Sequence, residues 1–307
     1  MMHALARVPG VTMVDPENIG EADVAVQFCH PTQFDRITCV PSVLYTMYEH
    51  PELPADFVSG AHRADALVVP SRFCEEMFRA NVRPMPCPLM VNPLGFDPQV
   101  FFPAAERPAP HPFRFLYVGD LNDRKGWHLI HKEAWKLFHA LPGVELYMKI
   151  SGDKSIAPKF FRAHNVIWDE RRLSREALRK LYHSAHAFVF PSMGEGFGLT
   201  LLEAIACGVP VIATDSGGVM EFLDPKNAWM VPAIRNWKMR TAGQIVTARR
   251  AEIPRLIGAM RDVIANYPLA LRMADEHVKS VQRFTWDSVA TSLAAQLATV
   301  TRRKVAA

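Results

Sequence analysis

Two glutamates in the stretch GEGFGLTLLEA (194–204) are the first candidates for chemistry. Glu195 precedes a glycine-rich bend, and Glu203 stands eight positions further along the chain. An ionised carboxylate accepts up to about four hydrogen bonds, so both side chains suit the hydroxyls of a sugar or a ribose. The alternative is a helix surface on which both carboxylates are solvated. The spacing of the pair alone favours neither interpretation.

A second stretch, FLYVGDLNDRKGWHLI (115–130), places two cations beside a glycine. Arg124 and Lys125 precede Gly126 in a pattern typical of strand, glycine turn and helix. Cations at the carboxyl end of the first strand of a doubly wound domain are well placed to bind a diphosphate. A solvated Arg-Lys pair is the common alternative. The chain has neither the GxxxxGK[ST] phosphate loop nor the GxGxxG fingerprint, which argues against a dehydrogenase.

The second half of the chain predicts a parallel sheet that would position these loops. Near-continuous apolar runs alternate with amphipathic patterns, which is typical of strands buried between two layers of helices. Helices are expected over 127–140 and from the N-cap Ser174. The expected strands are FRFLYV (113–118), VELYMKI (144–150), NVIW (165–168), AFVF (187–190), PVIA (210–213) and AWMV (228–231). We therefore predict a doubly wound α/β domain.

The opening stretch fits this alternation. Residues 187–213 predict strand, loop, helix, turn and strand, with the helix over 199–207 ended by Gly208. The backbone amides around Gly198 to Thr200 would then form an anion site at the helix start. In this arrangement Glu195 lies in the loop and Glu203 about one turn inside the helix.

The first hundred residues predict a shorter α/β region. VAVQF (24–28) and ALVVP (66–70) are expected as buried strands, and residues 71–80 as a helix capped by Ser71. The proline-rich segment 102–112 favours a stiff connection. We place an N-terminal domain at 1–106 and a second domain at 107–284. Two such domains would leave a cleft at the carboxyl ends of their strands.

The composition is that of a soluble globular enzyme. Of the 307 residues, 49% are hydrophobic and 21% charged, and the net charge is +4. The five cysteines are irregularly spaced, which favours reduced thiols over disulfides or a zinc site. No apolar run reaches the ~18 residues of a membrane span, and the N-terminus lacks a signal pattern. We expect a cytoplasmic protein, with peripheral membrane contact left open.

The motifs together resemble glycosyltransferase family 4, the nucleotide-sugar-dependent enzymes of GT-B fold. EGFGLTLLEA followed by GVPVIATDSGG is similar to the E-x7-E region of that family, and YVGDLNDRKG to its phosphate-binding turn. The resemblance extends over roughly residues 21 to 300 through NPLGFDPQVF (92–101), LSREALRKLYHSAHAFVFPS (173–192) and RFTWDSVA (283–290). It implies two Rossmann-like domains, with a helix in 285–307 that crosses back to the first.

The resemblance also implies roles for individual residues. Glu195 would hold hydroxyls of the donor sugar, Glu203 would hold the ribose, and Lys125, assisted by Arg124, would neutralise the diphosphate. The donor is expected to be a UDP- or GDP-sugar, with no tightly bound cofactor and no metal. Lys149, at the end of a strand, would add positive charge, and base choice would depend on the backbone near Val166 to Arg172. The remaining donor-side candidates are Gly119, Gly196, Phe197, Gly198, Leu199 and Thr200.

The chain departs from the family pattern at two places. Asp120 stands where many members have an arginine after the glycine of the phosphate turn, so Arg124 is a candidate substitute. The family's first domain normally opens with a strand and a glycine-rich loop, whereas only about twenty poorly matching residues precede Asp23. We expect either a naturally reduced first domain or a chain abbreviated at its start.

Acceptor recognition has few candidates. His30 and Glu49 would line the acceptor side, although a structural histidine and a loop-capping carboxylate are the alternatives. Residues 233–250 carry basic side chains and no acidic one, which predicts either a solvated loop and helix start or a surface for a polyanionic acceptor. These basic residues are Arg235, Lys238, Arg240, Arg249 and Arg250.

The leading hypothesis is a retaining glycosyltransferase that moves a sugar from a nucleoside diphosphate to an acceptor hydroxyl. Two alternatives stay open: a glycosyltransferase that acts on hydroxymethylated bases of DNA, and a non-catalytic module that binds nucleotide sugars. The acceptor, whether glycan, lipid or nucleic acid, is not specified by any motif.

Overall fold

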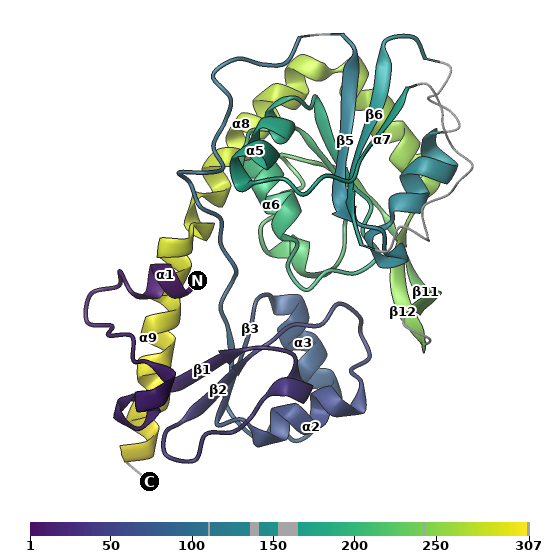
Figure 1. Ribbon diagram of the computed structural model, residues 1–307. Coiled ribbons are helices and arrows are strands. Elements are labelled where there is room, and N and C mark those ends of the chain that lie inside the picture. The colour runs from purple at the N-terminus through teal and green to yellow at the C-terminus, as the bar shows by residue number, and fades with distance from the viewer. Residues whose placement is uncertain (110, 136–140, 153–164, 242–243, 306–307) are drawn as a thin grey trace. The chain divides into compact units, whose positions relative to one another are not determined.

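The computed structural model describes residues 1–109, 111–135, 141–152, 165–241 and 244–305 (Figure 1). The chain folds into two compact units. The first comprises Met1–Gly95, Glu195–Phe197 and Arg283–Ala307, and the second comprises Phe96–Gly194 and Gly198–Gln282.

The second unit is built on a parallel sheet with the strand order β10-β9-β8-β5-β6-β7. Each of its strands overlaps one of the six runs predicted from the sequence, so the prediction of a doubly wound α/β domain is confirmed. The strands are β5 (Phe113–Asp120), β6 (Val144–Ser151), β7 (Val166–Asp169), β8 (Ala187–Phe190), β9 (Val211–Thr214) and β10 (Trp229–Val231).

Helices cover both faces of this sheet because its strands are apolar on both sides. Phe115 and Val189 belong to a buried cluster that includes Met260 of α7. Phe188, the neighbour of Val189, points to the opposite face, where its ring lies 5.8 Å from that of Tyr182 on α5. The helices of this unit are α5 (Arg175–His183), α6 (Leu199–Ala206), α7 (Ile253–Ala265) and α8 (Tyr267–Val281), with short helices η3 (Asp123–Lys125) and η6 (Gly217–Glu221).

The helix predicted over 127–140 differs from the expectation. Its described part contains a π-helix, η4 (Leu129–Ala134), and residues 136–140 lie outside the described residues. Two tryptophans flank this helix and both are buried, Trp127 and Trp135. The helix predicted from Ser174 is confirmed, since the Ser174 hydroxyl accepts a hydrogen bond from the Ala177 amide at 3.1 Å.

The first unit contains a smaller parallel sheet with the order β1-β2-β3-β4. The predicted helix at 71–80 is confirmed as α3, and Ser71 caps it by accepting from the Cys74 amide at 3.2 Å. The strands β2 and β4 were not predicted. The elements are α1 (Met2–Leu5), η1 (Pro16–Glu21), β1 (Ala25–Phe28), η2 (Pro31–Gln33), β2 (Ser42–Tyr45), α2 (Ala55–Arg63), β3 (Ala66–Val69), α3 (Arg72–Asn81), β4 (Leu89–Val91), η7 (Gln282–Phe284, which begins at the last residue of the second unit) and α9 (Trp286–Val305).

The C-terminal helix α9 groups with this first unit. The Gln296 side-chain amide donates to the Val91 carbonyl at 2.9 Å, and Arg7 pairs with Asp287 in the first turn of the helix. The domain limits 1–106, 107–284 and 285–307 stay predictions.

The basic segment 233–250 is neither a loop nor a helix start. It forms an antiparallel hairpin of β11 (Ala233–Thr241) and β12 (Gln244–Ala251) in the second unit. Met239 and Ala248 are buried in the main cluster, which explains the strands: alternate apolar positions face the domain, while Lys238 and Arg240 lie on the opposite face.

Candidate functional site

The two candidate loops follow neighbouring strands. β5 and β8 pair in parallel through Phe115 and Ala187, so their carboxyl ends meet at one edge of the sheet. The turn that contains Arg124 and Lys125 follows β5, and the loop that leads into α6 follows β8. The structure therefore brings these two motifs together at the edge where open parallel sheets bind ligands.

The turn after β5 is bonded to the loop after β8. Arg124 Nη1 donates to the Gly194 carbonyl at 2.6 Å, and the Met193 amide donates to the Arg124 carbonyl at 2.7 Å. Gly126 has φ of +69°, and a Cβ at this position would lie 2.0 Å from the Pro191 carbonyl oxygen. The two loops thus pack so closely that only glycine fits between them.

The side chain of Lys125 is half-buried beside this contact. Its amide donates to the Asn122 carbonyl at 2.9 Å, and the Asn122 side chain accepts from the Arg124 amide at 2.9 Å. The turn is therefore fixed by its own backbone. Arg124 bonds to the loop with its guanidinium, which gives it a positioning role, while Lys125 is the next residue of the same rigid turn.

The helix α6 begins at a glycine that no other residue replaces easily. Gly198 has φ of +99°, and a Cβ there would lie 2.7 Å from Cγ1 of Val219. The amides of Leu201 and Leu202 both donate to the Gly198 carbonyl, at 3.1 and 3.2 Å. The amides of Leu199 and Thr200 come before this first intrahelical bond, and such N–H groups attract anions.

Glu203 lies in the second turn of α6 and is held by a buried tyrosine. The Tyr182 hydroxyl lies 3.2 Å from Oε2 of Glu203 and 3.1 Å from the Thr200 carbonyl. Burial raises the pKa of Glu203 to about 7, and also raises the pKa of Tyr182. The hydrogen bond from Tyr182 opposes this shift of the Glu203 pKa, because it stabilises the ionised carboxylate.

Glu195, Gly196 and Phe197 group with the first unit instead of the second. Glu195 is only 5% exposed, and the Ser71 hydroxyl donates to the Gly196 carbonyl at 2.7 Å. The Phe197 ring lies 6.3 Å from the Phe284 ring. The E-x7-E pair is thus divided between the units, with Glu203 in one and Glu195 in the other.

The remaining donor-side candidates fall at different ends of their strands. Gly119 and Lys149 lie at the carboxyl edge, where the buried Lys149 Nζ donates to the Ile150 carbonyl at 3.0 Å. Asp120, at the same edge, accepts from the Ser151 hydroxyl. Val166 is the first residue of β7 and packs on the buried cluster, so the structure does not bring its side chain to the carboxyl edge.

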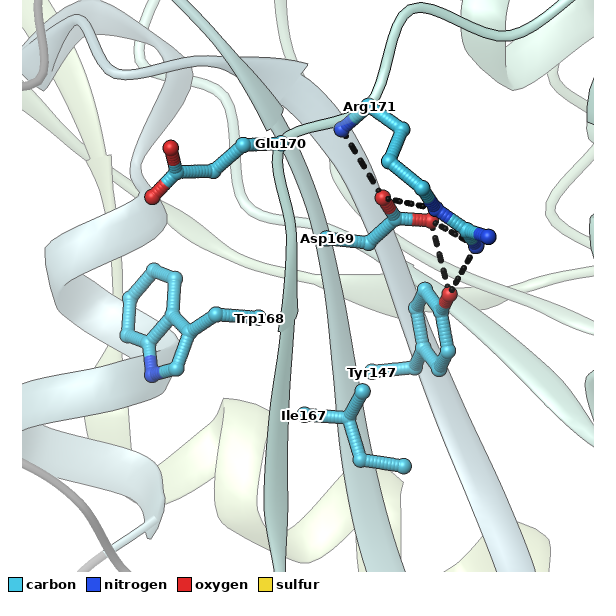
Figure 2. A pocket seen from close by; sticks show the side chains of 6 residues that line it. All are labelled: Tyr147, Ile167, Trp168, Asp169, Glu170 and Arg171. Atoms are coloured by element: carbon cyan, nitrogen blue, oxygen red, sulfur yellow. Dashed lines mark hydrogen bonds and ion pairs between the residues drawn. The ribbon is translucent and has the colours of Figure 1, made fainter.

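At the carboxyl end of β7 lies a side-chain cluster within residues 166–172, the stretch whose backbone was expected to decide the choice of base. Asp169 accepts from Arg171 Nε at 3.0 Å and Nη2 at 2.8 Å, and from the Tyr147 hydroxyl at 2.7 Å (Figure 2). The hydrogen bonds from Arg171 hold the pKa of Asp169 well below its usual range. Together with Ile167, Trp168 and Glu170, these residues line a hollow of about 510 Å³. Asp169 and Arg171 stand close together in the sequence and could have indicated an ion pair. Tyr147, which donates to Asp169, lies on the neighbouring strand β6 and could not be linked to them.

The acceptor-side candidates lie in the first unit. His30 caps η2: its Nδ1 lies 2.6 Å from the Thr32 hydroxyl and accepts from the Thr32 amide at 3.3 Å. Its ring packs 4.4 Å from that of Phe57. These contacts give His30 a structural role. Glu49 follows β2 in a half-buried loop.

The basic candidates all lie on the hairpin of the second unit. Arg235, Lys238 and Arg240 are exposed, whereas Arg249 and Arg250 are half-buried. The Arg250 guanidinium lies 4.8 Å from the centre of the Trp237 ring. In the part of the chain that the structure describes, no helix is long and apolar enough to cross a membrane.

Comparison with known proteins finds a family match within the second unit. Residues 112–246 match the family described as "Glycosyl transferases group 1". A D-inositol 3-phosphate glycosyltransferase of Paenarthrobacter aurescens is 34% identical over 144 residues, which are 42% of this chain and 35% of that protein. A glycogen synthase of Mycobacterium tuberculosis is 32% identical over 199 residues, which are 62% of this chain and 44% of that protein. The chain thus spans under half the length of these curated relatives.

Solved structures extend the likeness to the whole fold. Sucrose-phosphate synthase from Thermosynechococcus elongatus superposes with a TM-score of 0.70 at 19% identity, over 98% of this chain and 82% of that one. Anabaena HepE, solved in complex with UDP and glucose, has a TM-score of 0.65 at 18% identity, over 85% and 72% of the two chains. The predicted GT-B fold is confirmed, and residues 112–246 are similar to group 1 glycosyltransferases.

Proposed function

We propose that this protein transfers a sugar from a nucleoside-diphosphate sugar to an acceptor hydroxyl, with retention of the anomeric configuration. One observation carries the proposal: the turn with Arg124 and Lys125 is hydrogen-bonded to the loop that leads into α6. A cation and a helix N-terminus therefore share one edge of the sheet. Both are groups that stabilise a diphosphate.

The diphosphate would be bound by Lys125 and by the amides of Leu199 and Thr200. Arg124 would act through the backbone, because its bond to the Gly194 carbonyl fixes the approach of the chain to α6. Gly119, at the end of β5, would leave room for the phosphates beside this turn. Lys149 would add positive charge from the neighbouring strand β6.

Glu203 would bind the ribose. Its Oε2 faces Tyr182, whereas Oε1 has no hydrogen-bond partner among the described residues. Two ribose hydroxyls could donate to this carboxylate, since an ionised carboxyl group has about four lone-pair sites. Glu195 would accept from hydroxyls of the donor sugar, with the Gly196 and Phe197 amides beside it.

The reaction would proceed on one face of the sugar. The bond between the anomeric carbon and the diphosphate oxygen breaks, and the acceptor oxygen bonds to the same carbon from the side on which the diphosphate leaves. A departing phosphate oxygen takes the acceptor proton. Lys125 and the helix amides stabilise the charge that develops on the leaving group, an effect worth about 3 kcal/mol per well-placed donor. The protein's own residues supply this stabilisation, and we propose that no metal is required.

The donor class follows from the same site and from the relatives. Anabaena HepE was solved with UDP and glucose. A pneumococcal O-GlcNAc transferase of similar fold was solved with UDP and GlcNAc. We therefore propose a UDP-sugar as the first donor to test and a GDP-sugar as the second.

A panel of UDP- and GDP-sugars screened for thermal stabilisation tests this proposal. A donor present at about 100 times its dissociation constant stabilises the folded state by about 2.7 kcal/mol. We expect one donor to raise the unfolding temperature, and the Glu203→Ala variant to lose most of that shift. The exposed Glu106→Ala variant is the matched control. Equal shifts in all three proteins would contradict the role of Glu203.

A further inference from the structure

The hairpin β11–β12 begins at the carboxyl edge of the sheet, where the candidate site also lies. β10 ends at Val231, and β11 begins at Ala233, whose amide donates to Oδ1 of Asp215 at 2.9 Å. On the returning strand, the Arg249 amide donates to the Met193 carbonyl at 3.0 Å. Because Met193 is bonded in turn to Arg124, the base of the hairpin is fixed to the candidate phosphate turn.

One face of the hairpin is turned to the domain and the other is not. Met239 and Ala248 belong to the buried cluster. Lys238 and Arg240 alternate with Met239 and therefore point the other way, and Arg240 lies directly opposite Ile245. Ile245 is 67% exposed. We call Lys238, Arg240 and Ile245 the hairpin patch.

The hairpin carries an unbalanced charge. Residues 233–251 include five basic residues and no acidic one. Lys238 Nζ donates to the Thr247 hydroxyl at 2.8 Å, and neither Lys238 nor Arg240 forms an ion pair with any residue that the structure describes. Figure 1 shows that the two strands extend past the sheet of their own unit. A long, cationic and partly apolar hairpin of this kind has a surface complementary to an anionic one.

We propose that the hairpin patch docks on an anionic lipid bilayer. Lysine and arginine gain from the negative surface of such a membrane, and an aliphatic side chain gains from burial at the boundary of its acyl chains.

A nucleic acid fits the same residues less well. Ile245 gains nothing from a phosphate backbone, and binding of single strands depends on aromatic faces that stack on bases. The Trp237 ring already has the Arg250 guanidinium over it, at 4.8 Å from its centre. Ile245 therefore has a role in binding to lipid and none in binding to DNA or RNA.

Co-sedimentation of the full chain with vesicles tests this proposal. We expect binding to vesicles of phosphatidylcholine mixed with phosphatidylglycerol and not to pure phosphatidylcholine, with weaker binding at high salt. Lys238→Gln with Arg240→Gln should weaken binding about 25-fold, at about fivefold per cation. Ile245→Ser should weaken it about tenfold without changing the salt dependence.

The matched control removes two cations elsewhere in the same unit. Arg261 of α7 and Arg272 of α8 are exposed, so Arg261→Gln with Arg272→Gln changes the net charge equally. We expect this variant to bind vesicles within about twofold of the wild type. Thermal unfolding of each variant verifies that it is folded.

Three results would overturn the proposal. These are absence of binding to the mixed vesicles, equal losses in the hairpin and control variants, and an unchanged affinity of Ile245→Ser. Binding of a labelled DNA or RNA oligonucleotide that depends on Lys238 and Arg240, without vesicle binding, would assign the hairpin to nucleic acid instead. Donor binding is not involved in any of these measurements, so they are independent of the proposed function.

Discussion

The two units use their polar residues differently. In the second unit, Lys125, the α6 amides and Glu203 lie at or near the carboxyl edge of one sheet, on turns fixed by the backbone. In the first unit, the candidate His30 and the residue Ser71 cap helices, and the candidate Glu195 is buried. A polar side chain that caps a helix uses its hydrogen bonds to stabilise the fold. A polar group at the carboxyl end of a strand lies where a ligand can bind. Substitutions in each unit test this contrast.

The largest expected effect is on Lys125. Lys125→Ala should lower the transfer rate by about 100-fold to 1,000-fold, because one preorganised charge on the leaving group would be lost. The measurement is the initial rate with saturating donor. Lys226→Ala removes an exposed lysine from the same unit and should leave the rate unchanged. Equal rates in Lys125→Ala and the wild type would remove the cation from the mechanism.

Gly126 tests the contact between the two loops. Gly126→Ala should destabilise the protein by about 3 kcal/mol, because alanine disfavours the positive φ and its Cβ would lie 2.0 Å from the Pro191 carbonyl oxygen. Gly258→Ala is the matched control within α7, where nothing lies within 4 Å of the added Cβ. That control should stabilise the helix by up to about 1 kcal/mol. Denaturant unfolding measures both, and the same sign in both variants would refute the close packing.

Glu203 should make donor binding depend on pH. Its folded-state pKa of about 7 is raised by burial, and ribose hydroxyls bind the ionised form best. One pH unit below that pKa, the donor dissociation constant should therefore be about tenfold higher than at alkaline pH, where Glu203 is fully ionised. Calorimetric titration of wild type and Glu203→Gln across neutral pH measures it. A pH-independent wild type would contradict the role of the carboxylate.

The same group predicts the sign of a stability change. A raised carboxyl pKa means that the folded state binds more protons than the unfolded state between the ordinary glutamate pKa and about 7. The contribution of Glu203 to stability is thus complete at acid pH and is lost as the pH rises through about 7. Unfolding free energies of the ligand-free protein should show this slope, and Glu203→Gln should reduce it.

The smallest effect is expected in the first unit. His30→Ala should cost about 1 kcal/mol of stability through loss of the η2 cap, and should leave donor affinity unchanged. Unfolding and donor titration of this one variant give both numbers. A large loss of donor affinity with normal stability would place His30 in the binding site and blur the contrast between the units.

Local signals explain what could be predicted from the sequence. Ser71 and Ser174 stand directly before amphipathic runs, and both cap helices as expected. The short strand β2 was missed because SVLY (42–45) has too few residues to show a pattern. The hairpin was missed because most of its residues are polar or basic, so the alternation of the buried Met239 with exposed neighbours is not visible as a pattern of hydrophobic residues.

The candidate site was predictable only in part, for a related reason. Each of the two loops, 119–126 and 194–200, is one continuous stretch of sequence, so the chemical groups that it carries can be read directly. The bonds of Tyr182 to Glu203 and of Tyr147 to Asp169 join residues about twenty positions apart on different elements. Such contacts follow from strand order and helix packing, and no spacing in the sequence encodes them.

Release of nucleoside diphosphate from a donor without acceptor tests the central claim most directly. A glycosyltransferase hydrolyses its donor slowly with water as acceptor, whereas a binding module does not. We predict measurable release by the wild type with the donor selected in the thermal screen, and a loss of at least about 100-fold in Lys125→Ala with Lys226→Ala unaffected. Donor binding without any release, or equal release by the wild type and Lys125→Ala, would contradict the account.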